Sequence, residues 1–160
     1  MLFTTKSKVN SRRFFRYWLP ALVWMAVIFV GSTDVLSEPN TSRFIVPLLF
    51  WLNPHISFEA VDMINMACRK FGHVSEYAIL AVLLWRALRA ETHWQARISV
   101  MFVATLLGCA AFAAGDEFHQ SFVPTRTPSL RDILIDLAGA SVALMICALV
   151  AQKRSGPERI

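Results

Sequence analysis

Charge is scarce in this sequence, and the scarcity excludes most classes of soluble protein. Asp, Glu, Lys and Arg make up 17% of the 160 residues, whereas hydrophobic residues make up 56%, and the mean hydropathy is +0.48. Average soluble chains are only about 45–50% apolar even when glycine is counted. The sequence therefore predicts one compact unit that faces lipid over much of its length.

Cysteine and metal-binding patterns are also sparse. Cys68, Cys109 and Cys147 form no CxxC or other metal-ligand spacing. Cys109 and Cys147 fall inside apolar runs, where a free thiol packs as a small hydrophobe. We therefore expect no disulfide within the chain, and no cofactor is evident.

The net charge of +5 points to a membrane rather than to nucleic acid. Most basic residues precede the first apolar run, flank the short central loop or follow the last run, as a positive-inside bias would place them. Nucleic-acid binding would need a basic soluble surface with groove-reading or aromatic elements, and the sequence has none. Anionic lipid headgroups are the expected counterpart of these flanks. We expect residues 1–16 and 152–160 to be basic cytoplasmic ends at a bacterial cytoplasmic membrane.

Four apolar runs are long enough to cross a bilayer, at about residues 17–33, 71–88, 98–115 and 133–151. We expect the first to be a retained signal-anchor helix with Pro20 in its first turn, where proline is tolerated. With the basic flanks inside, the chain crosses in, out, in, out and in, so that both termini are cytoplasmic. The predicted fold is an all-α membrane protein, in which residues 17–151 form one bundle of four transmembrane helices.

The connection between the first and second runs is predicted to hold two further membrane-associated elements. Residues 44–52 are apolar but too short to span, which suits an interfacial or re-entrant segment. Pro47 and the pair Asn53-Pro54 limit its helical potential. Over residues 58–71 apolar residues recur at roughly helical spacing, which predicts an amphipathic surface helix leading into the second span.

Hydrophilic residues gather at the three span ends that this topology places at the outer face. An ionisable side chain at a helix centre costs roughly 2.5–3.5 kcal/mol on insertion scales, so such residues are expected to pair or to serve a function. The candidates are Lys70, His73, Glu76 and Tyr77 in the second span, Asp116, Glu117, His119 and Gln120 in the third, and Arg126, Asp132 and Asp136 at the fourth.

Helical spacing assigns some of these side chains to shared faces. His73 and Glu76 are three residues apart and lie on one face with the following tyrosine. If the third helix continues through its polar end, Asp116 faces the same way as Gln120 and His119, whereas Glu117 turns aside.

The fourth span carries the deepest carboxylate. Asp132 and Asp136 are four residues apart, which places Asp136 about 6 Å farther along the helix. An unpaired carboxylate at that depth would seek a cation, for which Arg126 or His73 is the candidate. Gly139 continues the same stripe, where small residues let helices approach closely.

The cluster offers groups for acid–base chemistry. His119 or His73 could act as the general acid or base, oriented by Glu117 or Asp116, with Glu76 as a further carboxylate. A divalent metal held by the histidines and carboxylates is chemically allowed, although no HExxH or comparable motif supports it.

The same cluster offers groups for binding. The planar guanidinium group of Arg126, with Lys70 as a second cation, suits a phosphate group. Tyr77, Gln120 and the two aspartates of the fourth span are the other candidate ligand contacts. The alternative is structural, since polar residues at helix ends also serve as headgroup anchors or as an ion-pair network that holds helices in register.

The same residues carry a resemblance to a known family. The matching segments are Lys70-x-x-His73-x-x-x-Tyr77, Asp116-Glu117-x-His119-Gln120-x-Phe122-x-Pro124-x-Arg126, Ser129-x-x-Asp132, Gly139-Ala140 and the small polar stretch Gly31-Ser32-Thr33-Asp34. In these segments the chain resembles the VanZ-like family of small bacterial membrane proteins. The family usually shows Gly where this chain has Thr125 and Asn where it has Asp136. The family takes its name from a member linked to glycopeptide (teicoplanin) resistance, so the resemblance implies a role at the cell envelope without implying a particular activity.

Three functions remain open on the sequence. The first is an enzyme acting at the outer leaflet on a phosphate-bearing, glycosylated or polyprenyl-linked lipid. The second is a non-catalytic protein that binds or shields a lipid-linked envelope precursor. The third is a small transporter, which is disfavoured because the cytoplasmic halves of the spans carry few polar residues to continue a path. Four short spans could gain a fuller interior by forming a homodimer, although nothing in the sequence specifies one.

Overall fold

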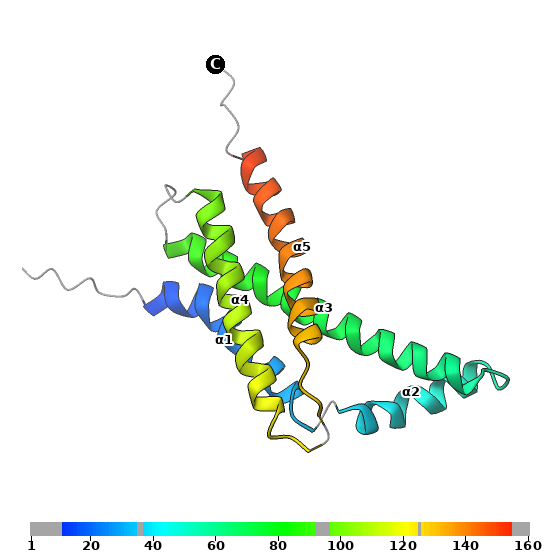
Figure 1. Cartoon of the computed structure of the whole chain (residues 1–160). Coiled ribbons are helices and arrows are strands. Elements are labelled where there is room, and N and C mark those ends of the chain that lie inside the picture. Colours follow the sequence, from blue (N-terminus) through cyan, green and yellow to red (C-terminus); the bar gives the residue numbers. More distant parts are fainter. Residues whose placement is uncertain (1–10, 35–36, 92–96, 125, 155–160) are drawn as a thin grey trace, which may run out of the picture.

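In the computed structural model, residues 11–34, 37–91, 97–124 and 126–154 are described, and they form five helices and no strand. The helices are α1 (Ser11–Gly31), α2 (Glu38–Leu52), α3 (Phe58–Glu91), α4 (Ile98–Gln120) and α5 (Leu130–Arg154) (Figure 1). All except α2 are long and apolar enough to cross a membrane. The chain is therefore an all-α, multi-pass membrane protein, as the sequence predicts. Lys6 and Lys8 of the predicted basic N-terminus and most of the predicted tail lie outside the described residues.

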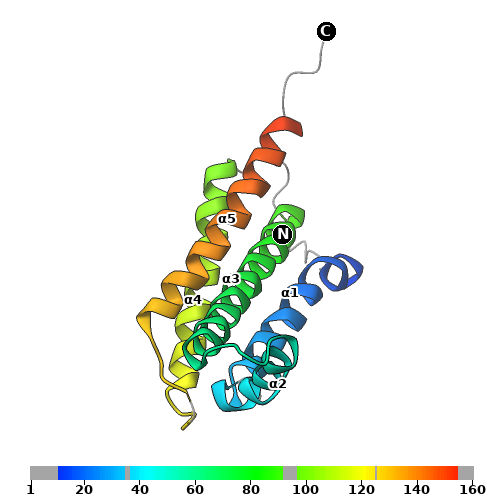
Figure 2. The same ribbon diagram turned by 90° about the vertical axis from the view of Figure 1, so that its right-hand side faces the viewer.

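Helix α3 is the centre of the bundle, with α1 on one side and α4 and α5 on the other (Figure 2). It crosses α5 very closely at Gly139, where an added Cβ would clash with the carbonyl oxygen of Val74. Ala140 and Ala143, on the same stripe, are also buried. The small residues of the fourth span therefore serve the close helix approach that the sequence predicts.

The buried core is narrow and the outer surface is apolar. Tyr77, Leu80 and Leu144 are fully buried between α3, α4 and α5. Large apolar side chains elsewhere on the helices, such as Leu107 and Ile146, remain mostly exposed. Such a surface is expected of helices whose outer faces contact lipid.

The predicted surface helix and the second span form one continuous helix. Helix α3 runs for 34 residues without a break, whereas the sequence treated residues 58–71 and 71–88 as two elements. Helix α2 also continues through Pro47 and ends at Asn53, whose N–H donates to the carbonyl of Leu49. The expectation that Pro47 would limit this helix was therefore wrong, whereas the helix does end at the pair Asn53-Pro54.

Helix α1 begins before the predicted first span, so that Pro20 lies in its interior and not in its first turn. A proline inside a helix cannot donate to the carbonyl four residues earlier, here that of Arg16. The side chain of Arg86 in α3 fills this place, since its Nη2 donates to the Arg16 carbonyl at 2.7 Å. The proline is thus accommodated by a partner from the neighbouring helix.

Helix α2 packs along the first half of α3, away from α4 and α5 (Figure 1). A hydrogen bond and a ring contact are among the interactions that join the pair. The amide nitrogen Nδ2 of Asn65 donates to Ser42 Oγ at 2.5 Å, and the rings of Phe50 and Phe58 lie 5.7 Å apart. We call α2 and residues 58–72 of α3 the arm.

Candidate functional site

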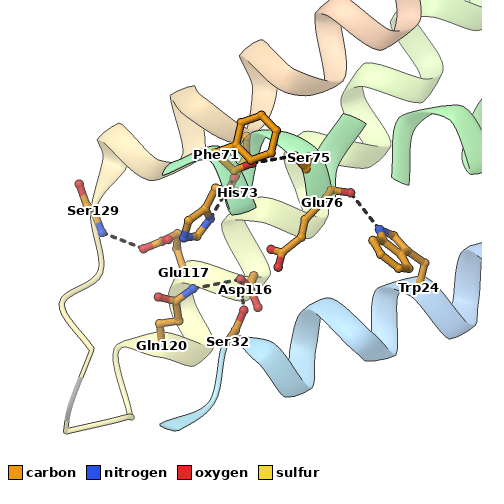
Figure 3. A network of polar contacts seen from close by, with 11 residues as sticks. Trp24, Ser32, Phe71, His73, Ser75, Glu76, Asp116, Glu117, Gln120 and Ser129 are labelled. Carbon is orange, nitrogen blue, oxygen red and sulfur yellow. Dashed lines mark hydrogen bonds and ion pairs between the residues drawn. The ribbon is translucent and has the colours of Figure 1, made fainter. Parts of the chain in front are cut away.

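The predicted polar clusters meet at one end of the bundle. The last turns of α1 and α4, the middle of α3 and the first turns of α5 bring their side chains together there (Figure 3). This polar end is built from segments that are up to 95 residues apart in the sequence. The convergence predicted from the topology is therefore confirmed.

His73 and Asp136 form a hydrogen-bonded pair between α3 and α5. Nδ1 of His73 lies 3.1 Å from Oδ1 of Asp136, whose side chain is only 2% exposed, against 18% for the histidine. Of the two partners expected for Asp136, His73 is the one found. The close approach at Gly139, one turn farther along α5, brings the two helices near enough for this contact.

Asp116 anchors the end of α4 to the end of α1. Ser32 Oγ donates to Asp116 Oδ2 at 2.6 Å, and Gln120 Nε2 donates to the same oxygen at 3.0 Å. The other oxygen, Oδ1, is buried without a hydrogen-bond partner among the described residues. Ser32 was not among the predicted site residues, although it belongs to the small polar stretch at the end of the first span.

Glu117 turns to the other side of α4, as its spacing predicts. Its Oε2 accepts the backbone N–H of Ser129 at 2.7 Å (Figure 3), which fastens the segment before α5 to the end of α4. Its Oε1 is buried and has no partner in the described part of the chain. Asp116 and Glu117 thus hold different neighbours, one on α1 and the other beside α5.

Arg126 caps the end of α1. Its Nη2 donates to the carbonyls of Gly31 at 2.7 Å and Thr33 at 3.1 Å, and its Nε donates to Thr33 at 3.3 Å. These carbonyls lack helical partners because α1 ends there. Burial and the neighbouring Arg69 lower the pKa of the Arg126 guanidinium, against the opposing effect of nearby carboxylates. The remaining nitrogen, Nη1, makes no hydrogen bond to the described residues.

A cavity of about 180 Å³ opens between the end of α1, the start of α2 and the middle of α3. Arg69 and Arg126 bring two guanidinium groups to its wall, and Glu76 brings one carboxylate. Glu76 points toward Asp116 (Figure 3), and its backbone carbonyl accepts the indole N–H of Trp24 at 2.9 Å. The remaining lining residues are Gly31, Ser32, Thr41, Ile45, Cys68, Gly72 and His73.

Eight of the eleven predicted site residues do not line this cavity, and four of them are described above, namely Asp116, Glu117, Gln120 and Asp136. The ring of His119 packs on Phe29 of α1, with ring centroids 4.2 Å apart, and its Nδ1 is buried without a partner among the described residues. Lys70 is exposed, and Asp132 is half-buried in the first turn of α5. Tyr77 is fully buried in the hydrophobic core.

The cavity residues that were not predicted from the sequence come chiefly from the arm. Arg69 and Cys68 precede the predicted second span, and Thr41 and Ile45 lie in the connection. The one sequence feature that could have pointed to them is the position of Arg69 next to Lys70, just before the predicted second span.

The arrangement suits an anion and acid–base chemistry better than a metal ion. Within the described ranges, no three His, Cys, Asp or Glu side chains are placed to hold a metal together. His73 lines the cavity on one side and contacts a buried carboxylate on the other, which is how an imidazole is held for proton transfer. The two guanidinium groups beside it are suited to phosphate or carboxylate oxygens.

Comparison with known proteins agrees with the resemblance carried by these residues. No curated protein and no solved structure matches the chain. Residues 17–151, which include the parts of α1, α3, α4 and α5 that form the polar end, match the model of the VanZ/LLP1 family. The protein therefore belongs to the VanZ/LLP1 family.

Proposed function

We propose that this is a cell-envelope protein of the bacterial cytoplasmic membrane that binds the phosphate-bearing headgroup of an envelope lipid at the polar end of its bundle. The observation that carries the proposal is the cavity, whose wall holds the guanidinium groups of Arg69 and Arg126 together with the carboxylate of Glu76. The cavity lies at an end of apolar spanning helices, where lipid headgroups lie.

The electrostatics of Arg126 favour an anionic ligand. Burial and the nearby Arg69 outweigh the surrounding carboxylates, so that the pKa of this guanidinium is lowered. A bound anion would relieve this imbalance. Because Nε and Nη2 already hold the end of α1, Nη1 would donate a hydrogen bond to a ligand oxygen while the cap stays in place.

The basic flanks support an outer location for the site. Arg86, Arg89 and Arg97 lie at the opposite ends of α3 and α4, and basic residues favour the cytoplasmic side. We therefore propose that both termini lie in the cytoplasm and that the polar end lies at the outer leaflet. The link of the family's namesake to teicoplanin resistance fits a ligand drawn from the lipid-linked precursors of the envelope.

The test is retention of lipid by the full-length protein. We expect lipid mass spectrometry of protein purified in mild detergent to find a phosphate-bearing lipid, and Arg69→Gln to lower its amount about tenfold. Arg131→Gln is the matched control, because Arg131 is exposed at the same end and does not line the cavity. Equal retention by Arg69→Gln and wild type would reject the proposal.

A second candidate, turnover of the bound lipid, is favoured by the pair of His73 and Asp136 at the cavity wall. The test is lipid mass spectrometry of cells that lack the protein and are complemented with wild type, His73→Gln or Asp136→Asn at matched membrane levels. If wild type alone corrects a shifted envelope lipid, the pair acts in chemistry. If both variants correct it as well as wild type, the protein binds without turnover.

A further inference from the structure

Helix α3, whose first residues belong to the arm, is longer than one crossing of a membrane requires. At about 1.5 Å per residue the 34 residues of α3 extend about 50 Å, whereas the hydrocarbon core of a bilayer is about 30 Å thick. The first half of α3 therefore extends beyond the other spans or lies tilted along the bilayer, together with α2 (Figure 1).

The surface of the arm fits the interface between hydrocarbon and headgroups. Large apolar side chains are exposed on both of its helices, while Arg43, Glu59 and Asp62 add exposed charges. Helices of this kind lie with the apolar side in the lipid and the charged side in the headgroup layer. The exposed apolar residues are Phe44, Leu48, Trp51 and Leu52 in α2, and Phe58, Met63, Met66 and Phe71 in α3.

The part of the arm next to the bundle, which we call its root, forms a wall of the cavity. This wall is partly apolar. Ile45 of α2 and Gly72 of α3 line the cavity beside the arginines. Their sequence neighbours Phe44 and Phe71 are 79% and 72% exposed. Large apolar side chains are therefore exposed at the sequence positions next to the cavity lining.

Gly72 leaves space at this point. A Cβ added there would meet nothing within 4 Å, in contrast to Gly139, where the neighbouring helix fills the space. Farther out, the contact of Asn65 with Ser42 closes α2 onto α3. The space over Gly72 thus lies at the root of the arm, next to the cavity.

We propose that the ligand is a membrane amphiphile held at two places: its phosphate headgroup in the cavity, and its hydrocarbon chain over Gly72 and against the apolar surface of the arm. This inference rests on the proposed function and narrows it, because a soluble phosphate compound would use only the first place. Gly72 then determines specificity by leaving room for the chain.

The test compares two glycine positions and two sources of phosphate. Full-length protein in phosphatidylcholine nanodiscs is titrated with dioleoyl phosphatidic acid and, separately, with inorganic phosphate, and bound lipid is counted by native mass spectrometry. Gly72→Ala, Gly72→Leu and Gly72→Trp form a series of increasing volume. Gly115→Trp is the control, because Gly115 is also open to added atoms but lies on the exposed face of α4.

We expect binding of phosphatidic acid to fall with side-chain volume at position 72, by about tenfold for Trp, and to stay within about twofold of wild type in Gly115→Trp. The alanine variant shows that the position tolerates a side chain, and thermal unfolding of the leucine variant shows that the fold persists. Inorganic phosphate is expected not to displace the lipid.

Each contrary result has a separate meaning. Unchanged lipid binding across the Gly72 series, with Arg69→Gln still defective, overturns the place of the chain but leaves the headgroup site. Displacement of the lipid by inorganic phosphate at a comparable concentration overturns the amphiphile and identifies free phosphate as the ligand. If wild type binds neither probe, the inference and the proposed function both fail.

Discussion

The two ends of the bundle use ionisable residues in different ways. At the end where α3 finishes, Arg86 is exposed, lies 5.4 Å from the ring centroid of Tyr17 and covers one backbone carbonyl. At the polar end, Asp116, Glu117 and Asp136 are buried, and each is held by a neighbouring element. Both ends carry ionisable residues at the ends of spanning helices, so their position does not distinguish them. The difference is burial: the charge at the α3 end is exposed, whereas the charges at the polar end are buried and held by neighbouring elements.

The largest effect should come from breaking the pair at the polar end. His73→Ala leaves the buried carboxylate of Asp136 without its partner, and removing one member of a buried pair costs about 3–5 kcal/mol. We expect a loss of this size in the free energy of unfolding measured in mixed detergent micelles. Asp136→Asn, which keeps a hydrogen-bonding oxygen without the charge, should cost much less. Equal costs for the two variants would mean that the charge of the pair is unimportant.

The close crossing of α3 and α5 provides the next test. Gly139→Ala places a methyl group against the backbone of Val74, which cannot rotate away. The helices must separate, so we expect destabilisation of about 3 kcal/mol, the upper part of the range for overpacking. Gly115→Ala should instead stabilise α4 by about 0.5–1 kcal/mol, because its added methyl meets nothing. The same unfolding assay measures both, and a neutral Gly139→Ala would contradict the described crossing.

A smaller effect is expected for the link between α1 and α4. Ser32→Ala removes a hydrogen bond to the buried Asp116 carboxylate, and bonds to charged groups contribute about 1.5–3 kcal/mol. We expect a loss near the lower value, because Gln120 still donates to the same oxygen. Ser121→Ala is the control, since its hydroxyl donates to a backbone carbonyl at an exposed position. Similar losses for both serines would remove the distinction between buried and exposed contacts.

The smallest effect is expected at the opposite end. Arg86→Ala removes an exposed guanidinium, and exposed charged contacts contribute about 0–1 kcal/mol. Thermal unfolding of the variant should therefore stay close to that of wild type, and Arg86→Lys should be closer still. A loss as large as that of Ser32→Ala would show that the two ends are built alike.

Much of the fold could be predicted because it depends on local patterns. The lengths of apolar runs locate the four spans, and the basic flanks order them. Helix bounds were harder to predict, because hydropathy changes where the environment changes and not where the helix ends. Helix α3 therefore continues through Phe71, where the sequence suggested a change of element.

The arrangement of site residues could be predicted from the sequence only where the residues lie on the same helix. The spacing within α4 indicates that Asp116 faces Gln120 and that Glu117 turns aside, and both contacts are found. The role of Arg126 could not be inferred in this way, because its acceptors are carbonyls 93 and 95 residues away. His119 was a reasonable candidate by type, but Phe29 of α1 covers its ring. Such contacts depend on how the helices pack against one another, and the periodicity of a single helix gives no information about that packing.

Arg86 donates to the carbonyl of Arg16, which Pro20 leaves without a helical hydrogen bond, and this contact links the residue types at positions 20 and 86. The arginine satisfies a requirement that exists only while the proline is present. A relative with an ordinary residue in place of Pro20 would have a complete helix and no need of this side chain. The two positions are therefore expected to change together between relatives, as a pair inherited in one state or the other.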